Sequence, residues 1–353
     1  MYAGIDTHKD TLAVAVVDHL GTVKAIAEHP NTHAGYAAIT AMLTLHHVER
    51  IGIEGSANYG RCISAHLALD TDRPWQVLEV PTLRTSRERA AQPSRGKTDP
   101  IDATVIARIT LRDNDLPPVR YAVGPAADLR SLIDYRDDLM AERTALANRA
   151  HMDLMGLFPG YQKTITTLTQ RRHLNAAIEL VTNDPRTRAD ITLRRLHRIE
   201  DIDTEARELR GQIATIVNNS GTRLTQIYGV GPLVAARFLA LVVDVNRYPN
   251  RDTFASANGT APIPASSGRT VRYRFNRGGN RQLNRCLYTI ALTQIRADTP
   301  GRIYYQRKIS EGKTSKEALR CLKRKLSDTI YNTMRRDQQP VTETSPTYLK
   351  EVA

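Results

Sequence analysis

The spacing of apolar positions divides the first 115 residues into short strands and helices. Three strands come first, and a glycine-containing turn joins the second strand to the third. Two helix-strand pairs and a further helix follow. The predicted strands are 2–6, 12–17, 23–27, 51–54 and 76–80, and the predicted helices are about 34–46, about 62–69, and one that opens at residue 99. This order predicts an α/β domain over residues 1–115, with helices on the faces of a mixed sheet.

Between residues 126 and 222 the apolar positions change to helical spacing. One apolar stripe runs from Leu129 to Leu154, and a second runs from Ile199 to Ile216 in steps of three and four residues. Such steps are heptad spacing. Two interpretations remain open: a helical hairpin within one chain, and a coiled coil between two copies.

A glycine turn opens the mainly helical region 223–336. Gly229-Val230-Gly231 precedes an apolar helix and resembles a helix-hairpin-helix turn, in which backbone N–H groups approach a phosphate. A turn that only begins a core helix has the same pattern. The sequence therefore leaves both roles open for these glycines.

A segment rich in Gly, Pro, Ser and Arg follows at 258–279. It predicts a long functional loop that contains a short strand at 271–275. A last helix is expected at about 315–334. Few apolar residues follow it, so a mobile tail is predicted at 337–353.

The positive charge of the chain is concentrated in its last third. The formal charge is +13, and residues 223–337 carry 22 Lys and Arg against 7 Asp and Glu, whereas the rest is nearly balanced. Such a region indicates binding to nucleic-acid phosphates. The candidate backbone contacts are Lys97, Gly229, Gly231, Arg272, Arg274, Arg277, Arg281, Arg285, Lys323 and Arg324.

Other features of the composition exclude several classes of protein. No apolar run reaches the roughly 18 residues of a membrane span, and the N-terminus lacks a signal pattern, so we expect a cytoplasmic protein with no membrane partner. The three cysteines are far apart and match no zinc-ligand spacing.

Four carboxylates stand at the ends of predicted elements. Asp6 ends the first strand, Glu54 ends the fourth, and Asp99 and Asp102 open a helix with the i, i+3 spacing that places both on one face. If the four converge, their repulsion calls for a divalent cation. The alternative is that Asp99, before Pro100, caps the helix and Asp102 favours its dipole.

The order of elements resembles the ribonuclease H fold, and within it the RuvC-like nucleases, whose acidic residues come from the first strand, the fourth strand and a late helix. The motifs add to this likeness. They are Gly4-Ile5-Asp6-Thr7-His8-Lys9, Ile53-Glu54-Gly55-Ser56-Ala57-Asn58-Tyr59, Lys97-Thr98-Asp99-Pro100-Ile101-Asp102-Ala103, the glycine turn, and a Ser-Gly loop after Gly-x-x-Pro. Together they resemble the DEDD transposases of insertion sequences. These are the serine-bearing recombinases described as bridge-RNA-guided, and the pilin-gene invertases are their relatives.

The resemblance covers about residues 2–335 and implies a RuvC-like domain, a coiled-coil linker at 126–222 and a transposase domain at 223–336. It implies that Asp6, Glu54, Asp99 and Asp102 bind Mg²⁺, with Mn²⁺ as the substitute and no organic cofactor. Ser267, directly before Gly268, is the implied nucleophile, although Ser266 stands beside it. Gly55-Ser56-Ala57-Asn58 departs from the usual Ala-Thr-Gly-Thr of the family.

The implied function is a DNA transposase or recombinase that forms a covalent phosphoserine. Its implied partners are the DNA of the element ends and the target, a structured guide RNA, and further copies of the chain in a dimer or tetramer. Two alternatives stay open. One is a metal-dependent junction-resolving nuclease that uses water, and the other is a non-enzymatic nucleic-acid-binding scaffold whose carboxylates only cap helices.

Overall fold

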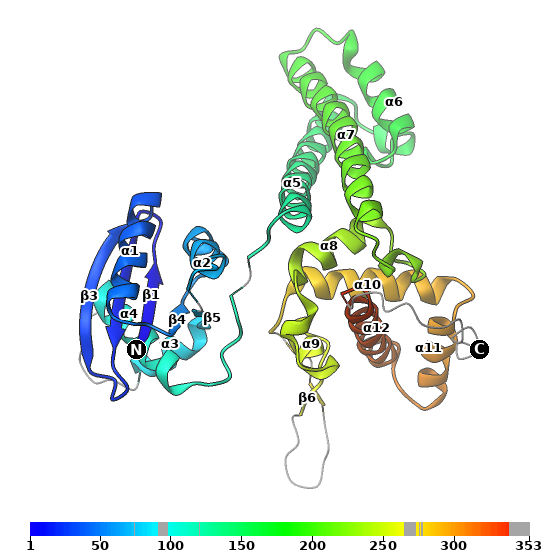
Figure 1. The fold of residues 1–353 in the computed structure, drawn as a ribbon. Coiled ribbons are helices and arrows are strands. Elements are labelled where there is room, and N and C mark those ends of the chain that lie inside the picture. Colours follow the sequence, from blue (N-terminus) through cyan, green and yellow to red (C-terminus); the bar gives the residue numbers. More distant parts are fainter. Residues whose placement is uncertain are drawn as a thin grey trace. The chain divides into compact units, whose positions relative to one another are not determined.

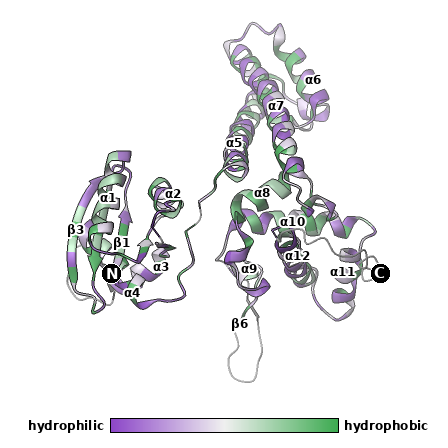
Figure 2. Cartoon of the chain, in the orientation of Figure 1, coloured by the Kyte–Doolittle hydropathy of each residue, from purple (hydrophilic) through white to green (hydrophobic). Residues whose placement is uncertain are grey.

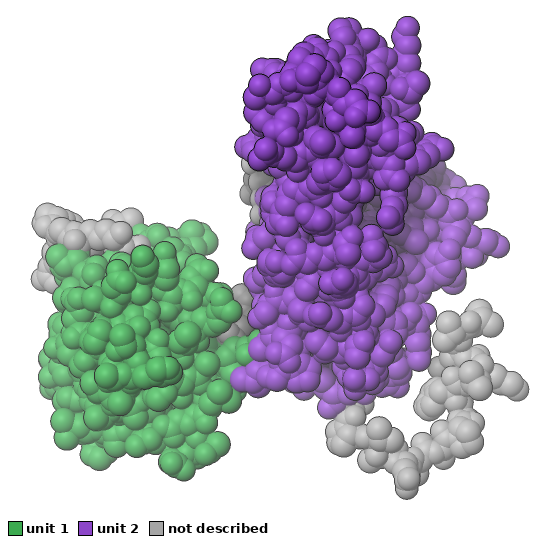
Figure 3. Space-filling model, turned by 90° about the horizontal axis from the view of Figure 1, so that it is seen from above, with its two compact units in different colours: residues 1–122 green, residues 123–353 purple. Residues whose placement is uncertain are grey.

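The fold was analysed in a computed structural model, which describes residues 1–73, 75–90, 98–119, 121–264, 273–274, 276 and 278–338. The chain divides into two compact units, unit 1 with residues 1–122 and unit 2 with residues 123–353 (Figure 3). Each unit is described by itself. No helix in these described ranges is long and apolar enough to cross a membrane.

Unit 1 is built on a five-stranded mixed sheet (Figure 1). Its strands are β1 (Tyr2–Thr7), β2 (Thr11–Val17), β3 (Val23–Pro30), β4 (Arg50–Ile53) and β5 (Gln76–Glu79). The spatial order is β3-β2-β1-β4-β5. The central strand β1 pairs antiparallel with β2 and parallel with β4. The predicted mixed sheet is confirmed.

Among the described residues of unit 1, four helices accompany the sheet: α1 (His33–Leu45), α2 (Arg61–Ala68), α3 (Thr82–Ala90) and α4 (Asp99–Arg112). Three of them match predicted helices, whereas α3 lies where only a basic segment was expected. Helix α4 packs directly on β1, β2 and β4. Gly4 permits this close approach, because a Cβ atom there would lie only 2.3 Å from the backbone oxygen of Ala103. The start of α4 is thereby held beside β1.

Unit 2 is mostly helical. Its α-helices in the described ranges are α5 (Pro125–Leu157), α6 (Arg171–Thr182), α7 (Thr187–Asn219), α8 (Pro232–Val242), α9 (Arg251–Ala257), α10 (Arg281–Arg296), α11 (Pro300–Ser310) and α12 (Ser315–Asp337). Short 3₁₀ turns lie at Tyr161–Lys163, Leu224–Gln226 and Val245–Arg247. Two short strands, β6 (Ile263–Pro264) and β7 (Tyr273–Arg274), pair antiparallel. Figure 2 shows α8 as mainly hydrophobic, and its buried side chains form part of one core with α10 and α12.

The heptad stripes meet within the chain. Helices α5 and α7 pack against each other, and the α7 residues Ile199, Ile202 and Ile213 are fully buried. Arg143 of α5 is buried too, and its guanidinium donates 2.5 Å and 2.8 Å hydrogen bonds to the carboxylate of Asp203 on α7. The helical-hairpin interpretation is therefore confirmed. Because the seam is covered by the chain's own helices, it gives no support to a coiled coil between copies.

Candidate active site

Two of the predicted acids stand at neighbouring strand ends in unit 1. Asp6 is the penultimate residue of β1, and Glu54 follows the last residue of β4. The two strands run parallel with Ile5 beside Ile53, and the Glu54 N–H donates a 3.1 Å hydrogen bond to the Ile5 carbonyl. The pairing of the strands therefore brings the two carboxylates to one end of the sheet.

The other two predicted acids lie in the first turn of α4, the helix that packs on β1. Asp102 is buried and Asp99 is partly exposed. The α4 N-cap is Thr98, not Asp99, and the Asp99 carboxylate lies 3.2 Å from His8 Nε2. The capping interpretation of Asp99 is thus wrong, since the helix begins at this residue and its side chain is directed to the loop after β1.

The electrostatics link Asp6 to the other three acids. Burial raises the pKa of Asp6, the His8 imidazole opposes that rise, and repulsion from Asp102, Glu54 and Asp99 raises the pKa further. Such mutual repulsion requires carboxylates in close range. The structure therefore places Asp102, Glu54 and Asp99 within electrostatic range of Asp6, and it places Asp6 and Asp99 together with His8 in one group that could hold a metal ion.

Two further residues of the site were not predicted. His8 Nε2 lies 3.3 Å from Asp6 Oδ2, and the buried Thr85 hydroxyl donates a 2.9 Å hydrogen bond to Glu54 Oε1. The spacing of Asp6 and His8 could have indicated the histidine, because alternate residues of an extended segment face the same side. Thr85 gave no signal, since it belongs to the unpredicted helix α3.

The donor set suits a hard divalent cation. One ligand atom each from Asp6, His8 and Asp99 can be chosen so that all lie within 4.8 Å of one another, and the Asp102 and Glu54 carboxylates are near. Carboxylate oxygens are the ligands of Mg²⁺ and Mn²⁺. A bound cation would also relieve the repulsion that raises the pKa of Asp6. His8 and Asp99 are 42% and 38% exposed, so the cluster is open to solvent on their side.

Several predicted residues lie outside the described parts of the chain. These are Lys97, Ser266, Ser267, Arg272 and Arg277. In the sequence, the two serines fall between β6 and β7. These two strands pair with each other, Ile263 with Arg274 and Pro264 with Tyr273. Only the backbone of Arg274 is described.

The glycine turn before α8 has two different environments. Gly229 has a φ of +87°, and a Cβ there would come within 3.2 Å of the Thr293 side chain on α10, so this glycine is required by its conformation and packing. At Gly231, the N-cap of α8, a Cβ would meet no atom within 4 Å. Packing therefore does not require a glycine at Gly231, which stays a candidate for a phosphate contact, whereas Gly229 has a structural role.

The basic residues of α10 and α12 differ in their exposure. Arg281 and Arg285 of α10 are exposed and form no ion pair with any residue in the described ranges. Arg324 of α12 instead pairs with Asp252 and Asp328. Lys316, Arg320 and Lys325 of the same helix are exposed. These three have the outward position that we expected of Arg324 and of its neighbour Lys323.

Lys323 faces inward and belongs to a buried polar network. It is 7% exposed, burial lowers its pKa, and its Nζ donates a 2.6 Å hydrogen bond to Asn284 Oδ1. Asn284 in turn donates to the Asn258 carbonyl, and the Asn258 amide donates to Ser327 Oγ. Asn258 Oδ1 accepts hydrogen bonds from the Thr260 backbone and hydroxyl. The network thus holds the chain just before β6.

Replacing Asn258 with alanine is expected to destabilise unit 2 by about 2 kcal/mol, because buried partners in this network would lose their hydrogen bonds. Asn258 is fully buried. Urea unfolding measures the change. Asn332→Ala, at an exposed position of α12, is the control and should change stability by less than about 0.5 kcal/mol. Equal effects of the two substitutions would contradict the role assigned to the network.

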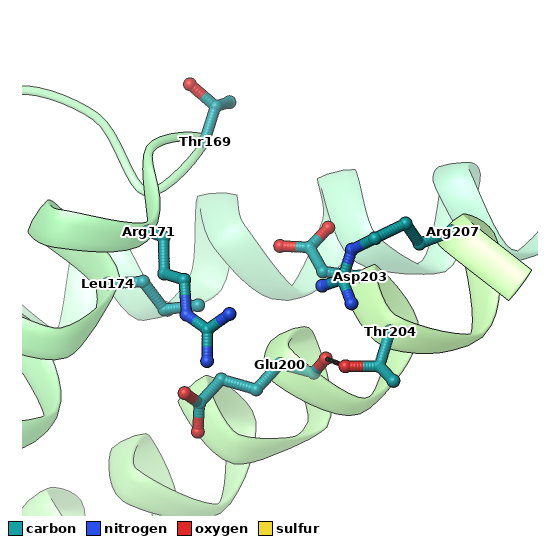
Figure 4. Close-up of a pocket in the computed structure, with 7 residues that line it drawn as sticks. All are labelled: Thr169, Arg171, Leu174, Glu200, Asp203, Thr204 and Arg207. Atoms are coloured by element: carbon teal, nitrogen blue, oxygen red, sulfur yellow. Dashed lines mark hydrogen bonds between the residues drawn. The ribbon is translucent and has the colours of Figure 1, made fainter.

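The helical hairpin also has a cavity of about 640 Å³, lined by Thr169, Arg171, Leu174, Glu200, Asp203, Thr204 and Arg207 (Figure 4). Two arginines and two acids face it, so its charge is balanced. One of the acids, Asp203, is already bound by Arg143. None of the predicted site residues lines this cavity.

Two family models match separate parts of the chain. Residues 3–159 match the family DEDD_Tnp_IS110, described as a transposase family, and residues 221–306 match the "Transposase IS116/IS110/IS902 family". The two matched regions together make up more than half of the chain.

Three relatives match about three quarters or more of the chain. The chain is 29% identical over 339 residues to the insertion element IS116 uncharacterized 44.8 kDa protein of Streptomyces clavuligerus, with 81% of this chain and 84% of the relative covered. It is 26% identical over 307 residues to the IS900 uncharacterized 42 kDa protein of Mycobacterium paratuberculosis, with 74% and 77% covered. It is 28% identical over 322 residues to the IS110 uncharacterized 43.6 kDa protein of Streptomyces coelicolor, with 76% and 78% covered. With both family matches and these relatives in agreement, the chain belongs to the IS110/IS116/IS902 family of insertion-element transposases.

Proposed function

We propose that this transposase cuts and rejoins DNA through a covalent phosphoserine on Ser267, and that a RuvC-like unit 1 holds Mg²⁺, or Mn²⁺, on Asp6, Glu54, Asp99 and Asp102. The observation that carries the proposal is the convergence of these four acids at one end of the sheet. Acids that only capped helices would have no reason to meet there. The family match, a transposase family with DEDD in its name, supports the same set of residues.

In the proposed reaction the Ser267 hydroxyl oxygen attacks a DNA phosphorus atom and the P–O bond to one strand breaks. The proton lost by the serine is balanced by the proton gained by the released DNA hydroxyl. A bound divalent ion supplies charge stabilisation at the phosphate and activates the hydroxyl, which is a weak nucleophile at neutral pH. The four carboxylates hold and orient that charge. The serine ester keeps the energy of the phosphodiester bond, so a DNA hydroxyl can replace the serine without ATP.

The partners in this proposal are the DNA of the element ends and the target, in the cytoplasm. A structured guide RNA is proposed to select both sequences, and the active assembly is proposed to be a dimer or tetramer. RNA guidance and assembly rest on the family resemblance. The positive charge of residues 223–337 supports nucleic-acid binding, with Arg281 and Arg285 as exposed candidates for phosphate contacts.

A single reconstitution tests the proposal. Purified protein is mixed with labelled element-junction DNA, Mg²⁺ and the transcript of the element, and then denatured. We expect labelled DNA that stays attached to the protein and that disappears when either the metal or the transcript is left out. Cutting without an attached product would instead favour the water-using nuclease. Binding without any cutting would favour the scaffold.

A further inference from the structure

We propose that His8 is a nitrogen ligand of the metal in this site, shared with Asp6 and Asp99, and that it makes the site prefer Mn²⁺ to Mg²⁺. This inference rests on the proposed function, because it requires that the acidic cluster binds a divalent ion. It adds a ligand of a different chemical kind to the four acids. The added ligand changes which cation the protein selects.

The position of the imidazole nitrogen supports a ligand role. His8 Nε2 lies 3.3 Å from Asp6 Oδ2 and 3.2 Å from Asp99 Oδ1. The nitrogen is buried, yet it forms no hydrogen bond to any residue that the structure describes. The Asp6 and Asp99 oxygens are close enough for a hydrogen bond, so it is the angle at the nitrogen that is unsuitable. The nitrogen lies within ion-pair distance of both carboxylates, and a metal ion bound among the three groups would take the place of the proton that such ion pairs require.

These separations are those of atoms that share one ion. With bonds of about 2.1 Å in octahedral geometry, ligand atoms at adjacent corners lie about 3 Å apart. The distances from His8 Nε2 to the two carboxylate oxygens are only slightly longer. One ligand atom each from Asp6, His8 and Asp99 lies within 4.8 Å of the other two, so a closure of these side chains around a cation would bring all three atoms into its coordination shell.

The backbone of His8 is fixed before any ion binds. Its N–H donates a 2.9 Å hydrogen bond to the Thr11 carbonyl, and its carbonyl accepts a 3.0 Å hydrogen bond from Asn31 Nδ2. Asn31 is itself held, since the Tyr36 hydroxyl donates to its Oδ1 and its Nδ2 also donates to the Tyr59 carbonyl. These contacts fix the turn between β1 and β2, so little ordering of His8 is needed on binding.

An imidazole ligand has a chemical consequence for metal choice. Mg²⁺ is a hard ion that takes oxygen ligands, whereas imidazole nitrogen is a ligand of transition metals. A site of oxygens alone discriminates little in favour of Mn²⁺. One nitrogen among the oxygens should therefore raise the affinity for Mn²⁺ more than the affinity for Mg²⁺.

Electron spin-echo spectroscopy of the full-length protein with one equivalent of Mn²⁺ tests the inference without reference to activity. We expect a ¹⁴N modulation from a directly bound nitrogen, and its replacement by a ¹⁵N modulation when the histidines are ¹⁵N-labelled. In His8→Ala the modulation should vanish. In the control His19→Ala, at an exposed turn position between β2 and β3, the modulation should remain.

Competition between Mn²⁺ and Mg²⁺ gives the second measurement. In His8→Ala the ratio of Mn²⁺ affinity to Mg²⁺ affinity should fall by at least about tenfold. Loss of a residue that only supports a metal ligand already lowers metal affinity by about tenfold or more, and loss of a direct ligand should cost no less. A bound Mn²⁺ without nitrogen modulation in the wild type would overturn the ligand role and leave the acidic metal site intact. No Mn²⁺ binding by the wild type would overturn the proposed metal function itself. The wild-type spectrum decides the matter even if the variant does not fold.

Discussion

Replacing Asp102 with asparagine will reduce metal-dependent DNA cutting and joining by about a thousandfold or more. The metal's stabilisation of charge in the transition state is worth several kcal/mol, and each 1.36 kcal/mol is about a factor of ten in rate. Asp102 is buried on the helix that Gly4 allows against β1, so no other side chain can easily take its place. Single-turnover cleavage of labelled junction DNA measures the loss. Asp10→Asn, at an exposed turn position, is the control and should retain full activity.

A substitution in the same site is expected to raise the stability of the metal-free protein, although it removes a proposed metal ligand. The pKa of Asp6 is raised in the folded state by burial and by its acidic neighbours, so the folded protein binds this proton more tightly than the unfolded chain does. In metal-free protein the stability that this group contributes is complete below the unfolded-state pKa, near 3.8, and is lost as the pH rises through the raised folded-state pKa. Asp6→Asn cannot lose a proton there. The variant should therefore unfold at a higher temperature than the wild type at pH 7 without metal.

Metal should reverse this order of stabilities. At a concentration about 100 times its dissociation constant, a bound ion adds about 2.7 kcal/mol to the wild type, and it should add much less to Asp6→Asn. Thermal unfolding between pH 4 and pH 8, with and without Mg²⁺, measures both effects. An acid with a purely structural role would lose stability on substitution in both conditions. That outcome at Asp6 would count against a metal site at this end of the sheet.

The positions of the strands and acids in unit 1 could be predicted because local pattern and sheet geometry agree. The apolar runs before Asp6 and Glu54 are strands, and the ends of neighbouring parallel strands meet at one edge of a sheet. The spacing of Asp99 and Asp102 placed both on one helix face. Which side of α4 faces β1 depends on the close approach that Gly4 allows. The sequence does not reveal this role of Gly4, because it appears only once the helix is packed on the strand.

Helix α3 could not be predicted, since its stability comes from distant residues. The segment has little apolar periodicity, and its Arg84 is held by the carboxylates of Asp113 and Asp115, about thirty residues later. Thr85, which binds Glu54, was missed with it. The inward direction of Lys323 has a similar cause, because the phase of α12 against α10 decides which of its basic residues meets Asn284. A sequence pattern indicates which side of a helix or strand is apolar, but it does not indicate which other element packs against that side.

Replacing Ser267 with alanine will remove the covalent protein–DNA product and lower strand joining by more than about a thousandfold, because no other group would carry the phosphate between strands. The measurement is the denaturation-resistant product with labelled junction DNA. Ser266→Ala is the matched control, since it changes an adjacent hydroxyl in the same segment, and it should keep the product. If Ser266→Ala loses the product and Ser267→Ala keeps it, the nucleophile is the neighbouring serine.

Mixing the Ser267→Ala and Asp102→Asn proteins carries this prediction one step further. Each variant is expected to be inactive alone, because one lacks the hydroxyl and the other lacks the complete acidic cluster. If each active centre takes its serine and its acids from one chain, a mixture contains no complete centre and stays inactive. If the centre is shared between copies, a mixed assembly contains intact pairs, and we expect the covalent product to return. Since the serine and the acids lie in different units of the chain, the mixture tests in one measurement whether the proposed homo-oligomer is required for the chemistry.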